Sequence, residues 1–286
     1  MSLAQKYIPS GVIGSPRDDF AKYLAGEKLY GDDFSTSQIE EWFEDEKEAY
    51  YDLGDRDPKR YVYEYHALNY YHGFRFLPPQ TFRQVLGVGS AYGEELRPIA
   101  ANVGSITIID SSESFKVSQL AGKPVEFARA QFDGRLPFAD EVFDLAVCFE
   151  VLHHIANVTT LVNEVRRCLL PGGYALLCEP IISMGDWRRP RQGLTKRERG
   201  IPLNIFREII GSGGLQVLRE RKCMFSLTSR LRYIMHSPVY NSRLCTALDA
   251  WICRLPFWPK QYHARFAVQK LRPRCVFYVV RKPPLS

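Results

Sequence analysis

Apolar and polar positions along residues 81–180 follow the pattern of strands that alternate with helices. Five short apolar runs predict strands, at residues 85–88, 106–109, 125–129, 143–149 and 174–178. Residues 93–102 and 158–170 have helical spacing, and Pro171-Gly172-Gly173 ends the second of these helices. Buried strands that alternate with amphipathic helices are typical of a parallel sheet covered on both faces. The pattern therefore predicts an α/β fold.

The N-terminal stretch, residues 1–80, is acidic and rich in aromatic residues. Ser35-Thr36-Ser37 precedes an apolar pattern around Trp42, which indicates a capped amphipathic helix. Pro78-Pro79 ends any helix before the first strand. We expect residues 1–80 to form a helical cap or substrate region.

The C-terminal stretch, residues 181–286, continues the alternation once and then departs from it. Residues 205–210 look helical, and residues 215–218 and 275–280 read as two further strands. Residues 224–273 are too many for an ordinary loop, and they are rich in apolar and aromatic side chains. We expect a helical insertion there, as a lid or an oligomerisation element.

Length and cysteine content narrow the class of protein. The 286 residues fit one large α/β domain with additions, or two small domains. No run reaches the ~18 uncharged apolar residues of a membrane span, and Met1 to Ser10 lack a signal pattern, so we expect a cytoplasmic protein without a transmembrane segment. The seven cysteines form no Cys-x-x-Cys pair, which favours structural thiols and no metal site.

Charge is distributed unevenly along the chain. Residues 1–80 carry 9 Lys/Arg against 15 Asp/Glu, residues 81–180 carry 8 against 12, and residues 181–286 carry 21 against 5. The net charge of +16 in the last stretch, which includes tracts at 188–191 and 196–199, suggests an anionic partner. The alternative is that this stretch complements the acidic N-terminal region of the same fold.

A glycine-rich turn follows the first predicted strand, in the run Gly87-Val88-Gly89-Ser90-Ala91-Tyr92-Gly93. Glycines at the end of a strand permit a tight turn and a close approach of the backbone to a ligand. The helix that follows begins with free N–H groups. Three residues separate Gly89 from Gly93, one more than in dinucleotide-binding turns, which disfavours a dehydrogenase.

An acidic residue, Asp110, ends the second predicted strand, twenty-one residues after Gly89. A carboxylate at that place can accept hydrogen bonds from two ribose hydroxyls. The alternative is a helix N-cap together with Ser111 and Ser112. We favour the ribose interpretation because of its distance from the glycine turn.

The run 84–180 resembles the core of class I S-adenosylmethionine-dependent methyltransferases, of the kind called methyltransferase type 11. Five motifs in order carry the resemblance: the glycine turn, Asp110, the segment 133–138 followed by Phe143-Asp144, the segment 149–154, and the segment 163–173. The resemblance implies a Rossmann-like, mostly parallel sheet of seven strands, in a domain spanning 81–286, with an antiparallel last strand at 275–281. It also implies S-adenosylmethionine as the cofactor.

The resemblance further implies roles for individual residues. Gly87, Gly89 and Ser90 would approach the methionine part of the cofactor, and Gly93 would bind the cofactor from the same turn. Asp110 and Ser111 would hold the ribose and the adenine edge. Asp133, with Gly134 beside it, would accept from the adenine amino group, although Asp133 also suits a turn. Phe149 and Glu150 would face the sulfonium region.

Two adjacent histidines, His153 and His154, lie just after the fourth strand, at the edge of the sheet where ligands of open α/β sheets bind. Histidine can take up a proton near neutral pH, so both are candidate general bases, with His153 ahead. The alternative is that they only pack or cap the next helix. Tyr63, Tyr65 and His66 could cover the cofactor, as could Tyr70 and Tyr71, or could belong to an aromatic helix packed on the sheet.

We predict methyl transfer to oxygen or nitrogen of a small molecule, with a sugar and a phosphorylated metabolite as candidate acceptors, and the basic C-terminal stretch favours an anionic one. A regulatory or assembly protein that binds S-adenosylmethionine without catalysis is an alternative, as is a nucleic-acid methyltransferase. The last is disfavoured because no Asn/Asp-Pro-Pro-Tyr motif occurs. A homodimer is compatible with the insertion.

Overall fold

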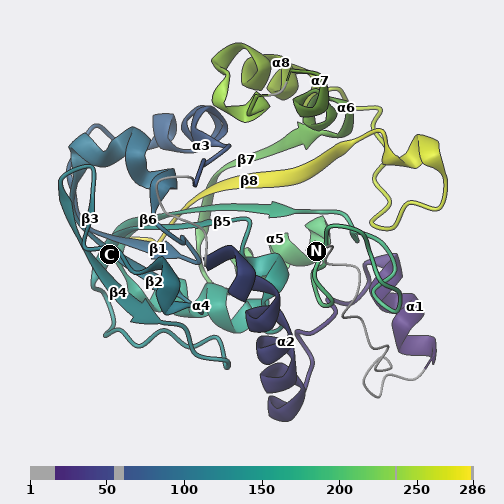
Figure 1. Ribbon diagram of the computed structural model, residues 1–286, viewed down its shortest axis with the longest axis horizontal. Coiled ribbons are helices and arrows are strands. Elements are labelled where there is room, and N and C mark those ends of the chain that lie inside the picture. The colour runs from purple at the N-terminus through teal and green to yellow at the C-terminus, as the bar shows by residue number, and fades with distance from the viewer. Residues whose placement is uncertain (1–16, 55–60, 236, 285–286) are drawn as a thin grey trace.

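The computed structural model describes residues 17–54, 61–235 and 237–284, and its centre is one mixed sheet (Figure 1). The strand order is β3-β4-β2-β1-β5-β6-β8-β7. The strands are β1 (Phe82–Val88), β2 (Val103–Asp110), β3 (Gln119–Leu120), β4 (Lys123–Arg129), β5 (Phe143–Phe149), β6 (Leu169–Pro180), β7 (Gln216–Phe225) and β8 (Pro273–Arg281). The expected α/β fold is confirmed. The two-residue β3, antiparallel to β4, brings the strand count to eight where seven were expected.

The sheet is parallel from β4 to β6, and β8 runs antiparallel between β6 and β7. This confirms the expected antiparallel last strand. β7 continues to Phe225, well beyond the predicted end at residue 218, because it pairs along β8 from Arg281 to Pro273. Buried apolar side chains on both faces of β8, such as Phe277 and Tyr278, explain its uninterrupted apolar sequence.

Helices cover both faces of the sheet, each over its own apolar cluster. α4 (Val158–Cys168) and α5 (Leu203–Ser212) pack on one face. The other face carries α3 (His66–His72) and the 3-10 helices η3 (Phe74–Phe76) and η4 (Glu94–Asn102). η4 stands where we expected a helix at 93–102, and Pro98, which has no N–H to donate, lies inside it.

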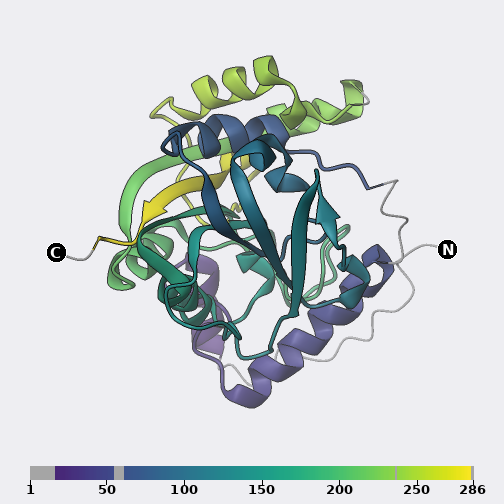
Figure 2. The same ribbon diagram turned by 90° about the vertical axis from the view of Figure 1, so that its left-hand side faces the viewer.

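An N-terminal cap (residues 17–54) lies beside the carboxyl ends of the strands. It consists of α1 (Arg17–Ala25) and α2 (Thr36–Gly54), and Figure 2 shows α2 crossing that side of the molecule. Trp42 of α2 is 1% exposed, and its Nε1 donates to the carbonyl of His154 at 2.6 Å. Asp32 accepts from Thr159 N at the start of α4, at 2.8 Å. The cap is therefore tied to the segments that follow β5.

The insertion (residues 224–273) is helical, in agreement with its sequence. It contains α6 (Ser226–Arg230), α7 (Arg232–Met235), η7 (Val239–Asn241), α8 (Arg243–Cys253) and η8 (Ala267–Lys270). Its α-helices lie at the outer edge of the molecule on the side of α3, in both views (Figures 1 and 2). The buried carboxylate of Asp249 anchors it, accepting from Met224 N and Phe225 N at 2.9 and 2.8 Å. No helix in the described part of the chain has the length and apolar character needed to cross a bilayer.

Candidate cofactor and acceptor site

The glycine turn takes a backbone conformation that explains its composition. Gly89, Ala91 and Gly93 have φ of +61°, +46° and +75°, a left-handed region that favours glycine. Gly89 N donates to Ile109 O at 2.8 Å, so the turn folds over the end of β2. A Cβ atom on Gly89 would lie 2.5 Å from the side chain of Val151. Only a glycine fits here without displacing the segment after β5.

Asp110 closes the other side of the turn from the last position of β2. Its Oδ2 accepts from Ala91 N at 3.1 Å, and its Oδ1 accepts from Ser112 N at 3.4 Å. Burial raises the pKa of this carboxyl group, and hydrogen bonds from the Ala91 and Ser112 N–H groups act in the opposite direction. The glycine turn and the acid at the second strand therefore form one hydrogen-bonded unit, as their spacing indicated.

A cavity of about 370 Å³ opens above this unit. Its lower wall is formed by the ends of β1, β2 and β5, and its upper wall by the N-terminal cap and the segment 61–65. The cavity lies in the size range of small-molecule sites, ~300–1,000 Å³. Its aromatic lining comes from both walls: Trp42, Phe43, Tyr61, Tyr63, Tyr65, Phe115, Phe132 and Phe149.

Most of the sequence-predicted cofactor residues line this cavity. They are Gly89, Ser90, Asp110, Ser111, Gly134, Phe149 and Glu150. Gly87 and Gly93 are not among the lining residues, since Gly87 lies beneath Ser90 and Gly93 lies against Ile108. The roles of these residues remain predictions, and the structure provides their placement.

Asp133 also lies outside the lining of the cavity. Its side chain accepts from Arg135 N at 3.0 Å, the pattern of a turn residue. Its backbone carbonyl accepts from the Asn157 side chain. Gln131, Phe132 and Gly134 line the cavity at this place instead.

Acidic side chains other than Asp110 also reach the cavity. Glu95 of η4 is 4% exposed, and burial raises its pKa to about 7, against the effect of a hydrogen bond from Ser90. Burial also raises the pKa of Glu150, which has a φ of +59° directly after β5. The sequence analysis missed Glu95. Carboxylates held at low exposure around an apolar cavity favour a cationic ligand.

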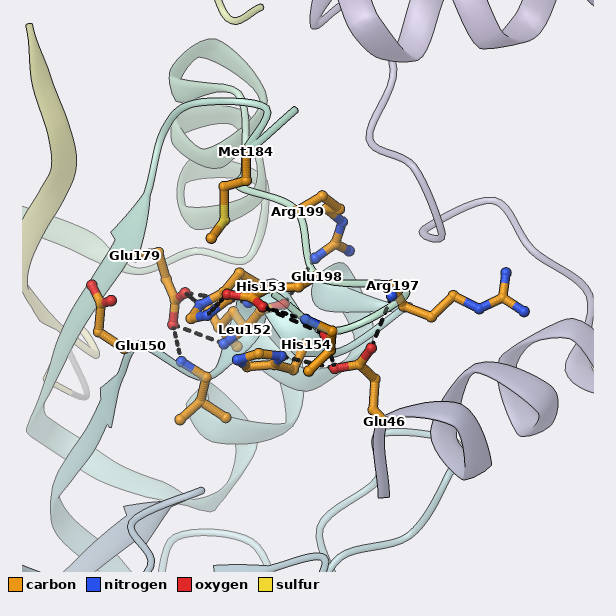
Figure 3. A network of polar contacts seen from close by, with 12 residues as sticks. Glu46, Glu150, Leu152, His153, His154, Glu179, Met184, Arg197, Glu198 and Arg199 are labelled. Carbon is orange, nitrogen blue, oxygen red and sulfur yellow. Dashed lines mark hydrogen bonds and ion pairs between the residues drawn. The ribbon is translucent and has the colours of Figure 1, made fainter. Parts of the chain in front are cut away.

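The two histidines differ in their surroundings (Figure 3). His153 is buried, its Nδ1 lies 2.8 Å from Glu179 Oε2, and its Nε2 lies 3.6 Å from Glu198 Oε1. Burial alone would lower the pKa of His153, but the two carboxylates outweigh it and raise the pKa to about 10. An imidazole that stays protonated at neutral pH cannot accept a further proton. His153 is also absent from the lining of the cavity.

His154 lines the cavity, and its Nδ1 lies 2.8 Å from Glu46 Oε2 of α2. Burial lowers the pKa of His154, and so does the neighbouring His153, while Glu46 acts to raise it. His154 is therefore neutral at neutral pH. Geometry and protonation state reverse the order of preference given by the sequence, and favour His154 over His153 as the candidate base.

A fully buried acid, Glu179, organises the turn that carries both histidines. Its Oε1 accepts from Val151 N and Leu152 N, both at 2.8 Å, and its Oε2 accepts from His153 N at 3.2 Å. Three N–H groups after β5 thus bind to one carboxylate at the end of β6. The sequence does contain a signal for Glu179, because it is an acid inside an apolar strand. An acidic residue is seldom buried unless it has hydrogen-bond or charge partners.

His153, His154 and Glu198 place one ligand-type atom each within 4.8 Å of one another. Nitrogen and carboxylate ligands of this kind suit a divalent transition metal, so these are the residues of the described chain that could hold one. Each of them already has a protein partner: Glu179, Glu46 and the Thr195 backbone N–H, respectively. The absence of a metal site remains a prediction.

The basic tracts of the sequence bind mostly to the protein itself. Arg197 Nε lies 2.7 Å from Asp45, Arg197 Nη2 lies 2.9 Å from Glu41, and Lys196 Nζ lies 2.9 Å from Asp45. Arg199 is fully buried and donates to the carbonyls of Tyr30, Leu152, Ile155 and Ala156. In the tract 196–199, positive charge therefore complements the acidic N-terminal cap, which was the alternative to an anionic partner.

The comparisons with known proteins agree with this geometry. Residues 86–177 match the family model described as "Methyltransferase domain". A ubiquinone biosynthesis O-methyltransferase from Paracidovorax citrulli is 30% identical over 104 residues, covering 34% of this chain and 44% of the relative. A demethylmenaquinone methyltransferase from Tropheryma whipplei is 30% identical over 100 residues, covering 34% of this chain and 41% of the relative. The matches thus span less than half the length of these relatives.

A solved structure shows the same fold over most of the chain. It is the N-methyltransferase NodS from Bradyrhizobium japonicum in complex with S-adenosyl-L-homocysteine, with a TM-score of 0.51 and 14% identity. It covers 84% of this chain and 99% of its own. The expected resemblance to class I S-adenosylmethionine-dependent methyltransferases is confirmed: residues 86–177 match the methyltransferase domain model, and the fold is that of a solved methyltransferase.

Proposed function

We propose that this chain transfers the methyl group of S-adenosylmethionine to a hydroxyl oxygen of a small molecule, with cofactor and acceptor meeting in the 370 Å³ cavity. The observation that supports it best is the joint lining of this cavity. The glycine turn and Asp110 form one wall, and the neutral His154 stands in the same cavity, held by the N-terminal cap.

The residues present fit the cofactor. Asp110 is an acceptor for ribose hydroxyls at the tip of β2, and Ser90 and Ser111 add polar groups beside it. The buried carboxyl groups of Glu95 and Glu150 would take their charged form beside a cationic ligand, and Phe132 and Phe149 supply flat apolar surface for an aromatic base. When bound, S-adenosylmethionine supplies a methyl group on an electrophilic sulfonium sulfur.

The residues of the chain then position the acceptor and move its proton. His154 would accept the hydroxyl proton as the methyl group passes from sulfur to oxygen, so that the sulfonium becomes a neutral thioether, the acceptor a neutral ether and the imidazole an imidazolium. Glu46 fixes the orientation of the imidazole and stabilises the charge it gains. The segment 61–65 and α2 exclude water from the cavity, which strengthens these interactions.

The aromatic lining indicates what the acceptor looks like. Trp42, Phe43 and Tyr61 favour an acceptor with an aromatic or aliphatic body over a sugar. The two curated relatives, named for ubiquinone biosynthesis and for demethylmenaquinone, are consistent with a hydroxylated ring as acceptor. Lys47 and Arg135 line the cavity as well and could accommodate an anionic substituent on it.

Isothermal titration with S-adenosylmethionine tests the proposal directly. We expect the wild-type chain to bind and Gly87→Arg to lose binding, because a side chain at this position meets Ser90 at 2.5 Å. Gly211→Arg is the matched control, since a Cβ atom at Gly211 has nothing within 4 Å. Absence of wild-type binding would refute the enzyme and the regulatory interpretations together.

A screen with labelled cofactor against hydroxylated aromatic compounds separates the remaining alternatives. Transfer that is lost in His154→Ala supports the proposed reaction. Cofactor binding without transfer to any acceptor favours a non-catalytic regulatory or assembly protein. Transfer to RNA or DNA, with salt-dependent binding, favours a nucleic-acid methyltransferase.

A further inference from the structure

The helix α8 (Arg243–Cys253) of the insertion carries large apolar side chains on its solvent side. Its buried side carries Thr246, Asp249, Ala250 and Cys253, each at most 4% exposed. Its exposed side carries Leu244, Leu248 and Trp251, which follow each other at the spacing of one helical stripe and are 80%, 51% and 61% exposed. A soluble surface helix normally turns its leucines inward.

The neighbouring helices extend this apolar stripe into a surface, which we call the outer face. It is formed by six exposed side chains of α6, α7 and α8: Leu227, Ile234, Met235, Leu244, Leu248 and Trp251. The three helices lie together at the outer edge of the molecule (Figures 1 and 2). Large exposed apolar side chains gathered on neighbouring helices indicate an interaction site.

The exposed charges of the insertion all have one sign. Residues 224–273 contain eight Lys/Arg and a single acid, the buried Asp249. Arg230 ends α6, Arg243 begins α8 and Arg254 follows it, and all three are exposed. Leucine and tryptophan on one face of a helix with arginines at its flanks are typical of a helix that lies in a membrane interface.

From this juxtaposition we infer that the outer face docks the protein on a bilayer of anionic phospholipid. The apolar stripe enters the boundary between headgroups and acyl chains, and the arginines bind the phosphate groups. A second copy of the chain fits less well. In a two-fold dimer the same face meets itself, so exposed arginines would oppose each other without an acid of the insertion to pair them.

Hydrogen bonds connect the insertion that carries the outer face to the cavity. Asn241 of η7 donates from its side chain to Tyr63 O at 2.7 Å, and its Oδ1 accepts from His66 N at 2.7 Å. Tyr63 lines the cavity. The insertion that would rest on lipid therefore also holds one wall of the site, which suits an acceptor that partitions into the bilayer.

Sedimentation of the 286-residue chain with vesicles tests the inference without requiring methyl transfer. One set of vesicles is pure phosphatidylcholine, and the other contains phosphatidylglycerol in addition. We expect binding to the anionic vesicles only, reduced by high salt, and a blue shift of tryptophan emission as Trp251 enters the interface.

Variants on exposed positions locate the contact. We expect Trp251→Ser and Leu248→Ser each to weaken vesicle binding about tenfold, and Arg243→Gln about fivefold. Leu170→Ser is the matched control, because Leu170 is an exposed leucine at the start of β6, far from the insertion. Its vesicle binding should equal that of the wild type.

Two results would overturn the inference. One is sedimentation that is absent, or that is the same with neutral and anionic vesicles. The other is a concentration-dependent dimer, lost in Leu248→Ser, in a chain that does not bind vesicles, since this assigns the outer face to a second copy. Either result leaves the cofactor titration unaffected, so failure of this inference is distinct from failure of the proposed function.

Discussion

Glu46 Oε2 lies 2.8 Å from Nδ1 of His154, although 108 residues separate the two in the chain. The contact joins the N-terminal cap to the turn after β5. Glu46 also accepts from Thr195 Oγ1 at 2.8 Å and from Arg197 N at 3.0 Å. One carboxylate of α2 therefore holds the candidate base and the segment after β6 in a common arrangement, and the cavity is complete only with the cap in place.

Glu46→Gln tests whether this contact serves catalysis. The glutamine keeps a hydrogen-bond acceptor for Nδ1 but removes the negative charge that raises the pKa of His154. Activity carried by neutral His154 falls as the pH drops through this lowered pKa, so the acid limb of the kcat profile should move to lower pH. We expect kcat to fall about tenfold, against about 10²–10⁴-fold for His154→Ala.

Glu44→Gln provides the control for that series. Glu44 lies on the same helix, is exposed and pairs with Lys47 at 2.9 Å. It should leave both kcat and its pH dependence unchanged. A pH profile in Glu46→Gln that coincides with the wild-type profile would show that Glu46 acts only in packing.

His153 should make the stability of the fold depend on pH. Its pKa is raised from 6.5 to about 10 in the folded chain by Glu179 and Glu198, against the effect of burial. The protonated imidazole stabilises the fold fully below pH 6.5, and this contribution is lost as the pH rises toward 10. Between these values the free energy of unfolding should decrease by roughly 1 kcal/mol per pH unit.

Urea denaturation at a series of pH values measures this slope, and His153→Gln should flatten it. NMR titration of the imidazole protons gives the pKa separately from stability. The two carboxylates do not hold the proton if the NMR titration midpoint of His153 lies near 6.5 and if the stability of wild type and variant changes equally with pH.

The sequence was sufficient to locate those parts of the site that adjoin the end of a predicted strand. The glycine turn, Asp110 and the turn after β5 each follow a strand directly, so strand periodicity locates them at the same edge of the sheet. Glu46 could not be singled out, because residues 40–48 contain six acids and packing decides which one faces inward. A partial signal was present, since Glu46 lies one helical turn after the buried Trp42.

The ranking of the two histidines depended on residues that are distant in the chain. Glu179 and Glu198 surround His153, and neither lies near it in the sequence. The adjacent acids of η4 pose the same difficulty. Glu94 pairs with Arg97 at 2.6 Å at the surface, whereas Glu95 is buried in the cavity wall, and nothing local distinguishes them. Tertiary packing sets these environments, and with them the protonation states that decide function.

Gly89→Ala and Gly122→Ala form a matched pair that tests the architecture of the glycine turn. Both glycines have positive φ, +61° and +78°, so both substitutions impose the same type of backbone strain, about 1–2 kcal/mol. Only the Cβ atom at Gly89 meets another side chain, 2.5 Å from Val151, while a Cβ atom at Gly122 has nothing within 4 Å.

We expect Gly122→Ala to lose stability only through the backbone strain and to retain its affinity for S-adenosylmethionine. Gly89→Ala should be less stable by a further ~1–3 kcal/mol and should bind the cofactor at least tenfold more weakly, because the turn after β5 must move. Thermal unfolding and titration calorimetry on both variants measure these differences, and equal behaviour of the pair would contradict the close approach of Gly89 to Val151.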